Sequence, residues 1–326
     1  MDLLIEIRGK SGALIGHPVL KSVQAVLRHV GIAERYLLRA RSERDEDLYN
    51  DVIYRTNQAF EGVLKAAYTV LTANSSAQLS PHQIEQHLLD TQVLSSRVLD
   101  LFRNYRQHWR NPSTHEHELF FNEQEALLAI VSVSAFVAVL LDQIIEKINY
   151  DREQQSLQTR TEDLQNIVSQ GLPLHLEVVN LLIRFSGDLL ASTPDPSQLR
   201  EVELIGRLSG FIESFNPTIK SVREPLLDEQ ARPDLLLTRG EEQVVLEVKR
   251  PGFSSRALAL GRNQLHRYLE VGKLRHGILY IPPVATETVT STCEKGTVAG
   301  MEVALHFVVP ENPKRSAPNP GPQADA

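Results

Sequence analysis

The chain is short of several residue types, and each shortage excludes a class of protein. Its 326 residues include one cysteine, Cys293, which excludes an intramolecular disulfide framework and a cysteine-rich zinc site. A chain with so little cysteine is typical of a reducing compartment. Positive charge is not in excess, because the formal net charge is -7, so a surface that coats nucleic acid throughout is also excluded. Any contact with nucleic acid is therefore expected to be local.

A hydrophobic run of membrane-spanning length is also lacking. Residues 126–141 carry no charge, but they include Ser132 and Ser134 and number fewer than the roughly 20 that a helix needs to cross a bilayer. We expect this stretch to form a buried helix or a subunit interface. The first residues show no signal-peptide pattern. The sequence therefore predicts a soluble, cytoplasmic protein with no membrane partner.

The composition is that of an ordinary globular protein, with 42% apolar and 23% charged residues, and the length suffices for about two domains. Residues 1–150 show helical periodicity with little strand-like alternation, and we expect a helical bundle there. Residues 151–172 begin polar and Gln-rich and are expected to form a helical linker. Residues 173–310 are expected to form an α/β domain, and residues 311–326, which are rich in proline, a disordered tail.

Hydrophobic periodicity predicts the individual elements. In the first domain it predicts helices near residues 18–29, 45–72, 81–106 and 123–148. In the second domain it predicts a helix near 197–215, strands near 219–227, 234–238 and 244–249, a helix near 256–271, and strands near 277–281 and 303–309. Ser80 before Pro81, and Asn122 with Glu125, have the pattern of helix N-terminal caps. The expected fold class is therefore multidomain, with a helical part followed by an α/β part.

The most informative segment is a predicted β-hairpin. Two short apolar runs flank a turn at Gly240 and Glu241, which is the signal for two antiparallel strands. A turn centred between these two residues pairs Asp234 with Glu247 across the hairpin. Because side chains alternate along a strand, Lys249 lies on the same face as Glu247. Three charged groups are thus expected to meet on one face.

Two opposed, partly buried carboxylates repel each other unless a cation joins them, and hard divalent cations prefer oxygen ligands. Asp234 and Glu247 are therefore candidate ligands for Mg²⁺ or Mn²⁺. Lys249 would act beside the metal on a scissile phosphate or on the attacking water. The alternative is a surface hairpin whose charges face solvent, which the apolar neighbours Leu246 and Val248 disfavour.

Pro233-Asp234 followed by Glu247-Val248-Lys249 resembles the PD-(D/E)XK motif of the restriction-endonuclease-like nucleases. Gln264-Leu-His-Arg-Tyr268 is similar to the Gln-x-x-x-Tyr motif of several branches of that superfamily. The resemblance implies an α/β core with a mixed sheet. It also implies metal binding by the two carboxylates, a lysine that assists the water, and Gln264 and Tyr268 as supporting or DNA-contacting residues.

In that superfamily the first helix often supplies a further acidic residue to the metal. Several glutamates of the second domain compete for this role, and the sequence alone does not choose between them: Glu177, Glu201, Glu203 and Glu213.

A second candidate site lies in residues 103–117, the most basic and histidine-dense segment. Cleavage of RNA by its own 2′-hydroxyl needs a proton acceptor near neutral pH and a cation for the phosphate, which histidine and arginine supply without a metal. Arg110 and His115 resemble the Arg-x(4–6)-His motif of HEPN domains, and His117 is an alternative base. Residues 59–65 resemble the second long helix of that family. The resemblance implies a helical bundle that forms a homodimer. A zinc site on His115 and His117 lacks further ligands nearby.

Three functions remain open from the sequence. The leading one is a metal-dependent nuclease whose Asp234, Glu247 and Lys249 hydrolyse nucleic acid, with DNA favoured over RNA. The second is a metal-independent HEPN ribonuclease that acts through Arg110 and His115, with the second domain binding nucleic acid. The third is a non-catalytic dimeric scaffold. Fusion of two such domains resembles microbial defence effectors, which is an analogy at the level of the fold.

Overall fold

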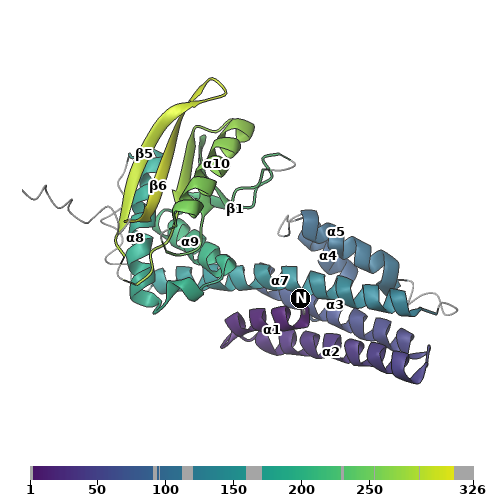
Figure 1. Ribbon diagram of the computed structural model, residues 1–326. Coiled ribbons are helices and arrows are strands. Elements are labelled where there is room, and N and C mark those ends of the chain that lie inside the picture. Colours follow the sequence, from purple (N-terminus) through teal and green to yellow (C-terminus); the bar gives the residue numbers. More distant parts are fainter. Residues whose placement is uncertain are drawn as a thin grey trace, which may run out of the picture. The chain divides into compact units, whose positions relative to one another are not determined.

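The computed structural model describes residues 3–90, 94, 96–111, 120–158, 171–228, 231–252, 254–285 and 287–311. Its contacts divide the chain into two compact units, Met1–Ile148 and Asn149–Ala326. The first unit is helical, and the second combines helices with one mixed sheet (Figure 1). The broad expectation of a helical part followed by an α/β part is confirmed.

The helices of the first unit pack around a shared apolar core. They are α1 (Leu3–Ser11), η1 (Gly12–Leu14), α2 (Leu20–Glu43), α3 (Leu48–Thr72), α4 (Pro81–Asp90), α5 (Ser96–Tyr105), the π-helical turn η2 (Arg106–Arg110) and the first part of α7 (Glu123–Gln158). The ring of Phe60 on α3 lies 5.0 Å from that of Phe102 on α5 and 5.1 Å from that of Phe136 on α7. These fully buried aromatic side chains join three helices at the centre of the bundle.

Several predicted boundaries in this unit are wrong. The helix expected at 18–29 continues to Glu43, because apolar residues at helical spacing persist along α2 and are buried. The helix expected at 81–106 is divided into α4 and α5. Both predicted caps are confirmed: the Ser80 hydroxyl accepts a hydrogen bond from the N–H of Gln83, and Asn122 and Glu125 bond reciprocally.

Helix α7 is the longest element and extends past its expected end at residue 148. It is long and apolar enough, by length and composition alone, to cross a bilayer, but more than half of its most apolar stretch is buried inside the protein. Val133, Phe136, Val137 and Leu140 are buried at the i, i+3, i+4, i+7 spacing of a core helix. Its last turns belong to the second unit, where Tyr150 donates a hydrogen bond to a glutamate of α9.

The second unit has the order α8 (Leu174–Ser192), η4 (Pro196–Gln198), α9 (Glu201–Phe215), β1 (Lys220–Arg223), β2 (Leu235–Arg239), β3 (Glu242–Val248), α10 (Ser255–Gly272), β4 (His276–Tyr280), β5 (Val289–Val298) and β6 (Met301–Pro310). The strands form one sheet in the order β1-β2-β3-β4-β6-β5. Strands β1, β2 and β3 are antiparallel, β3 pairs parallel with β4 and β4 with β6, and β5 is antiparallel to β6. The expected mixed sheet is confirmed.

Four elements of the second unit differ from those expected. The helix expected from residue 197 begins at Glu201, because Asp195 accepts the N–H of Ser197 and closes a separate 3₁₀ turn. Strand β1 is shorter than the expected 219–227. Strand β5 and helix α8 were not among the predicted elements; β5 is mostly exposed and polar, so no apolar alternation marks it.

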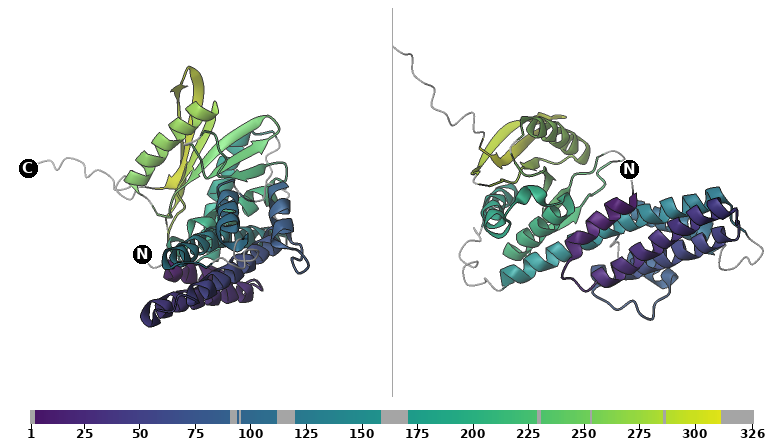
Figure 2. Two further views of the ribbon diagram at one scale, coloured as in Figure 1. Left: turned by 90° about the vertical axis from the view of Figure 1, so that its right-hand side faces the viewer. Right: turned by 60° about the horizontal axis from the view of Figure 1, so that its bottom comes forward.

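Helices cover both faces of the sheet. Helices α8 and α9 lie on one face and α10 on the other (Figures 1 and 2). Along β3 the side chains alternate between the two cores: Val244, Leu246 and Val248 pack with α8 and α9, whereas Val245 packs with Leu265 of α10. The sheet therefore separates two layers, each of which can hold its own site.

Candidate functional site

The hairpin of β2 and β3 has the predicted register. Leu235 pairs with Leu246 and Arg239 with Glu242 around the turn at Gly240, whose φ is 56°. Continuing this register brings Asp234, one residue before β2, level with Glu247. The N–H of the next residue on β3 donates a hydrogen bond to Oδ2 of Asp234 at 2.6 Å, which fixes this carboxylate beside the end of the strand.

Glu247 is a buried carboxylate with only one of its oxygens bonded. Its residue is 3% exposed. Oε1 accepts a hydrogen bond from Nζ of Lys249 at 2.5 Å. Oε2 is buried and has no hydrogen-bond partner within the described part of the chain. A buried, unbonded carboxylate oxygen is costly, so this position favours a ligand that brings positive charge.

The environment of Asp234 also favours a ligand that brings positive charge. Burial is the largest cause that raises the pKa of its carboxyl, and the charge of Glu247 is the second; together they raise it to about 7. The hydrogen bond from the N–H of Val248 and the charge of Lys249 lower it, but less. Near neutral pH the carboxyl of Asp234 therefore tends to keep its proton when no cation lies beside it. The pair is therefore arranged for a cation or for a proton.

Helix α10 brings two further predicted residues to the same place. Ser254 caps the start of α10 by accepting the N–H of Ala257 at 3.2 Å, which begins the helix just after β3. Nζ of Lys249 donates to Oε1 of Gln264 at 2.7 Å. The hydroxyl of Tyr268, one turn further, donates a hydrogen bond to the carbonyl of Arg232 at 3.2 Å. Burial and the nearby acids raise the pKa of Tyr268, so its hydroxyl stays protonated.

The four candidate glutamates of the second unit have different interactions in the structure. Glu177 forms an ion pair with an arginine of β2. Glu203 accepts the backbone N–H of the residue before α9, and Glu213 accepts the N–H and hydroxyl of a β1 serine. Glu201, the exposed first residue of α9, is the one whose charge raises the pKa of Asp234. Its place at a helix start was visible in the sequence, but its distance from the hairpin was not.

The second predicted site is described only in part. Arg110 ends η2, and its Nε lies 3.3 Å from Oε1 of Glu61 on α3. Both side chains are partly exposed. Glu61 lies within the segment that resembles the second HEPN helix, and its pairing with Arg110 was not predicted. His115 and His117 lie outside the described residues.

The chain was compared with family models, with curated proteins and with solved structures, and nothing matches in any of the three comparisons. The second unit is therefore classified by its own features. They define an α/β protein in which two carboxylates, a lysine, a glutamine and a tyrosine gather at the end of an antiparallel hairpin.

Proposed function

We propose that the protein is a metal-dependent nuclease whose second unit hydrolyses phosphodiester bonds, with DNA favoured as the substrate. The observation that best supports the proposal is the buried, unbonded Oε2 of Glu247 level with Asp234. These residues fit a divalent cation, because they offer only oxygen donors and because a cation offsets the burial and the repulsion by Glu247 that raise the pKa of Asp234. Asp234 and Glu247 would hold Mg²⁺ or Mn²⁺, and Glu201, whose charge acts on Asp234, is the proposed further acid.

When bound, the cation would stabilise charge on the phosphate and make a coordinated water more acidic. The ammonium of Lys249 is held between Glu247 and Gln264 by hydrogen bonds of 2.5 and 2.7 Å. Held there, it can donate to a phosphate oxygen as negative charge develops in the transition state. Gln264 therefore positions Lys249, and Tyr268 fastens α10 to the segment before Asp234 through its bond to the carbonyl of Arg232.

The surroundings of the site also support a phosphodiester substrate. Arg250 directly follows Lys249, Arg256 lies in the first turn of α10, and both are exposed. Exposed arginines beside a catalytic centre bind the phosphate backbone without reading its sequence. The second unit resembles PD-(D/E)XK nucleases, and the first unit resembles a HEPN bundle. On these two resemblances we also propose that the chain is a cytoplasmic microbial defence effector.

A cleavage assay on untagged, full-length protein tests the proposal. Single- and double-stranded DNA and RNA would be incubated with Mg²⁺, Mn²⁺ or EDTA, and the products separated on gels. We expect cleavage only with metal, and a loss on the order of 100-fold or more for Glu247→Gln and Lys249→Met, as for other groups that stabilise transition-state charge. Glu241→Gln, in the exposed turn of the same hairpin, is the matched control and should cut normally. Undiminished cleavage by Glu247→Gln would contradict the proposal.

A second candidate function is metal-independent RNA cleavage by the first unit. The π-helical turn η2, which carries Arg110, favours it, because such turns occur frequently at functional sites. It predicts cleavage of RNA in EDTA that Arg110→Ala abolishes and Glu247→Gln preserves, with products that end in cyclic phosphate. A scaffold without catalysis, the third alternative, predicts no cleavage in any arm and no metal uptake in calorimetry.

A further inference from the structure

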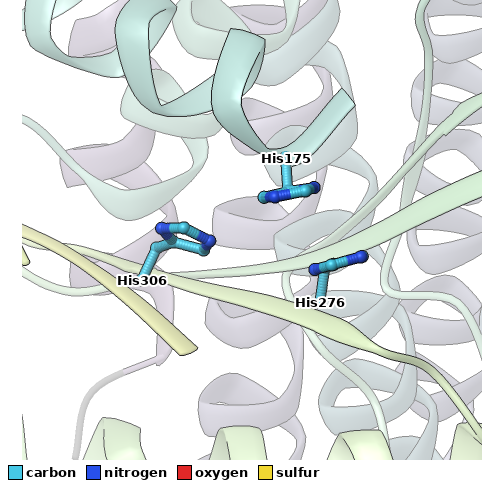
Figure 3. Close-up of side chains that lie close together, drawn as sticks. All are labelled: His175, His276 and His306. Atoms are coloured by element: carbon cyan, nitrogen blue, oxygen red, sulfur yellow. The ribbon is translucent and has the colours of Figure 1, made fainter. Parts of the chain in front are cut away.

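Three histidines from distant parts of the chain gather on the other face of the sheet. His175 lies in the first turn of α8, His276 begins β4, and His306 lies in the middle of β6. One ring nitrogen of each lies within 4.8 Å of those of the other two. Figure 3 shows the ring of His175 reaching from α8 toward the two rings that rise from the strands.

The register of the sheet explains why they meet. His306 pairs with Ile278 in the parallel ladder of β4 and β6, so His276 and His306 stand two residues apart on the face that packs on α8. Cys293 of β5 is level with His306, and its Sγ lies 3.9 Å from Nε2 of that histidine. Glu247 points to the opposite layer, where α10 lies, so the sheet separates the two clusters.

The chemical state of the rings suits a metal. Burial is the main cause that lowers the pKa of all three histidines, and it brings that of His306 to about 4. They are therefore neutral near pH 7, which is the form that binds metals. Nδ1 of His276 is buried without a hydrogen-bond partner in the described residues. The carboxylate of Glu242 acts electrostatically on His175 and His276 and supplies negative charge nearby.

We propose that His175, His276 and His306 bind one Zn²⁺ ion, with the thiolate of Cys293 as the fourth ligand. Nitrogen and sulfur donors in a tetrahedral set are typical of zinc and unsuited to Mg²⁺. Tetrahedral ligand atoms lie about 3.3–3.6 Å apart, so the histidine nitrogens, which lie within 4.8 Å of one another, must move closer. Sγ of Cys293 lies 3.9 Å from Nε2 of His306 but not within 4.8 Å of all three histidines, so its side chain must turn toward the other two rings. The rings of His175 and His276 are stacked in parallel at 3.8 Å, and binding rotates one of them out of the stack.

The proposed ion is structural. It would join the start of α8 directly to β4, β5 and β6, and the packing of three neutral rings would be replaced by bonds to one metal ion. Because a metal that binds only the folded chain stabilises it, zinc should raise the thermal unfolding midpoint. The ion lies across the sheet from the carboxylates, so it is independent of the nuclease proposal.

Metal titration of untagged, full-length protein tests the site. After removal of bound metal by a chelator and dialysis, Zn²⁺ would be added in the calorimeter and Co²⁺ followed by absorption, both in excess Mg²⁺ to occupy oxygen sites. We expect one Zn²⁺ per chain and the visible bands of tetrahedral Co²⁺. His175→Asn and His306→Asn should each weaken binding by about 100-fold or more, since loss of a direct ligand exceeds the roughly 10- to 100-fold effect of groups that only orient ligands.

Controls separate this site from others. His266→Asn, on the exposed face of α10, and Glu247→Gln should both bind zinc as the unaltered protein does. Cys293→Ser should remove the thiolate-to-cobalt charge-transfer band, and an unchanged spectrum would overturn the assignment of the fourth ligand. Circular dichroism checks that the variants fold; His175 is the safer of the two ligand substitutions, because it is less buried than His306. No uptake by the unaltered protein, or tight binding by both His→Asn variants, would overturn the site.

Discussion

At the scale of single residues, burial decides the chemistry of the carboxylate site. Glu247 on the surface of a hairpin would be an ordinary solvated acid. At 3% exposure, with one oxygen unbonded and a second acid beside it, the same side chain raises the pKa of Asp234 and favours a cation. Lys249 alone does not neutralise the negative charge of the two carboxylates, because its ammonium also bonds Gln264 and reaches only one oxygen of Glu247.

The raised pKa of Asp234 predicts a pH dependence of stability without metal. Its pKa is about 7 in the folded chain and about 3.9 when unfolded, so the folded state binds more protons between these values. The stabilisation from this proton is complete below about pH 4 and is lost as the pH rises through about 7. Four histidines with lowered pKa, His29, His175, His276 and His306, act in the opposite direction, so the comparison with Asp234→Asn isolates this carboxyl.

Urea unfolding in EDTA at pH 5 and pH 8 measures the effect. We expect the stability of the unaltered protein, relative to Asp234→Asn, to fall from pH 5 to pH 8. Excess Mg²⁺ should stabilise the unaltered protein more at pH 8, because carboxylates bind metal only when ionised. An identical pH dependence in the two proteins would show that Asp234 does not hold the extra proton.

At the scale of elements, close approach of α10 to β4 sets the position of Gln264 and Tyr268. Gly261 faces the sheet, and a Cβ there would lie 2.4 Å from Cδ1 of the fully buried Leu279. No larger residue allows this helix–strand distance without a shift. Gly187 on α8 has open space around its Cα and makes no such contact. Both glycines lie in helix interiors, but only at Gly261 would a Cβ collide with a neighbouring side chain.

Alanine at these two glycines should therefore have opposite effects. Gly261→Ala is expected to destabilise the protein by about 1–3 kcal/mol through overpacking. Gly187→Ala should stabilise it by about 0.5–1 kcal/mol, because alanine loses less backbone entropy in a helix. Denaturant unfolding of both variants measures the difference. Equal and stabilising effects at both positions would mean that α10 does not pack against Leu279 at this distance.

At the scale of the whole molecule, α7 carries an apolar surface that its own bundle does not cover. Leu127, Leu128 and Val131 are 41%, 54% and 50% exposed and lie within one helical turn. The opposite side of the same helix is buried in the core of the first unit. We propose that this surface contributes to a homodimer, in keeping with the expectation that residues 126–141 form a buried helix or an interface.

Sedimentation equilibrium at several protein concentrations tests the homodimer. We expect the unaltered protein to sediment as a dimer and Leu128→Asp to shift it toward the monomer, because a buried unpaired charge opposes association. Leu260→Asp is the matched control, since Leu260 is similarly exposed (52%) but lies on α10 of the second unit. A monomer at every concentration, or equal effects of both substitutions, would contradict this interface.

The sequence by itself determined the elements whose cause is local. Two short apolar runs and a glycine turn set the hairpin and its register, and a spacing of four put Gln264 and Tyr268 on one face of a helix. The caps at Ser80 and Asn122 were equally local. These features depend on residues close together in the chain, so they can be read without knowing how distant segments pack.

Only the tertiary structure decided which distant residues meet. Strand β5 is polar and exists through its ladder with β6, so its own pattern does not reveal it. The approach of Glu201 to Asp234 depends on how α9 packs against the sheet. The cluster of His175, His276 and His306 depends on strand order, because it joins one helix to two strands across the sheet. Proximity of this kind is set by packing and sheet order, and no spacing along the chain records it.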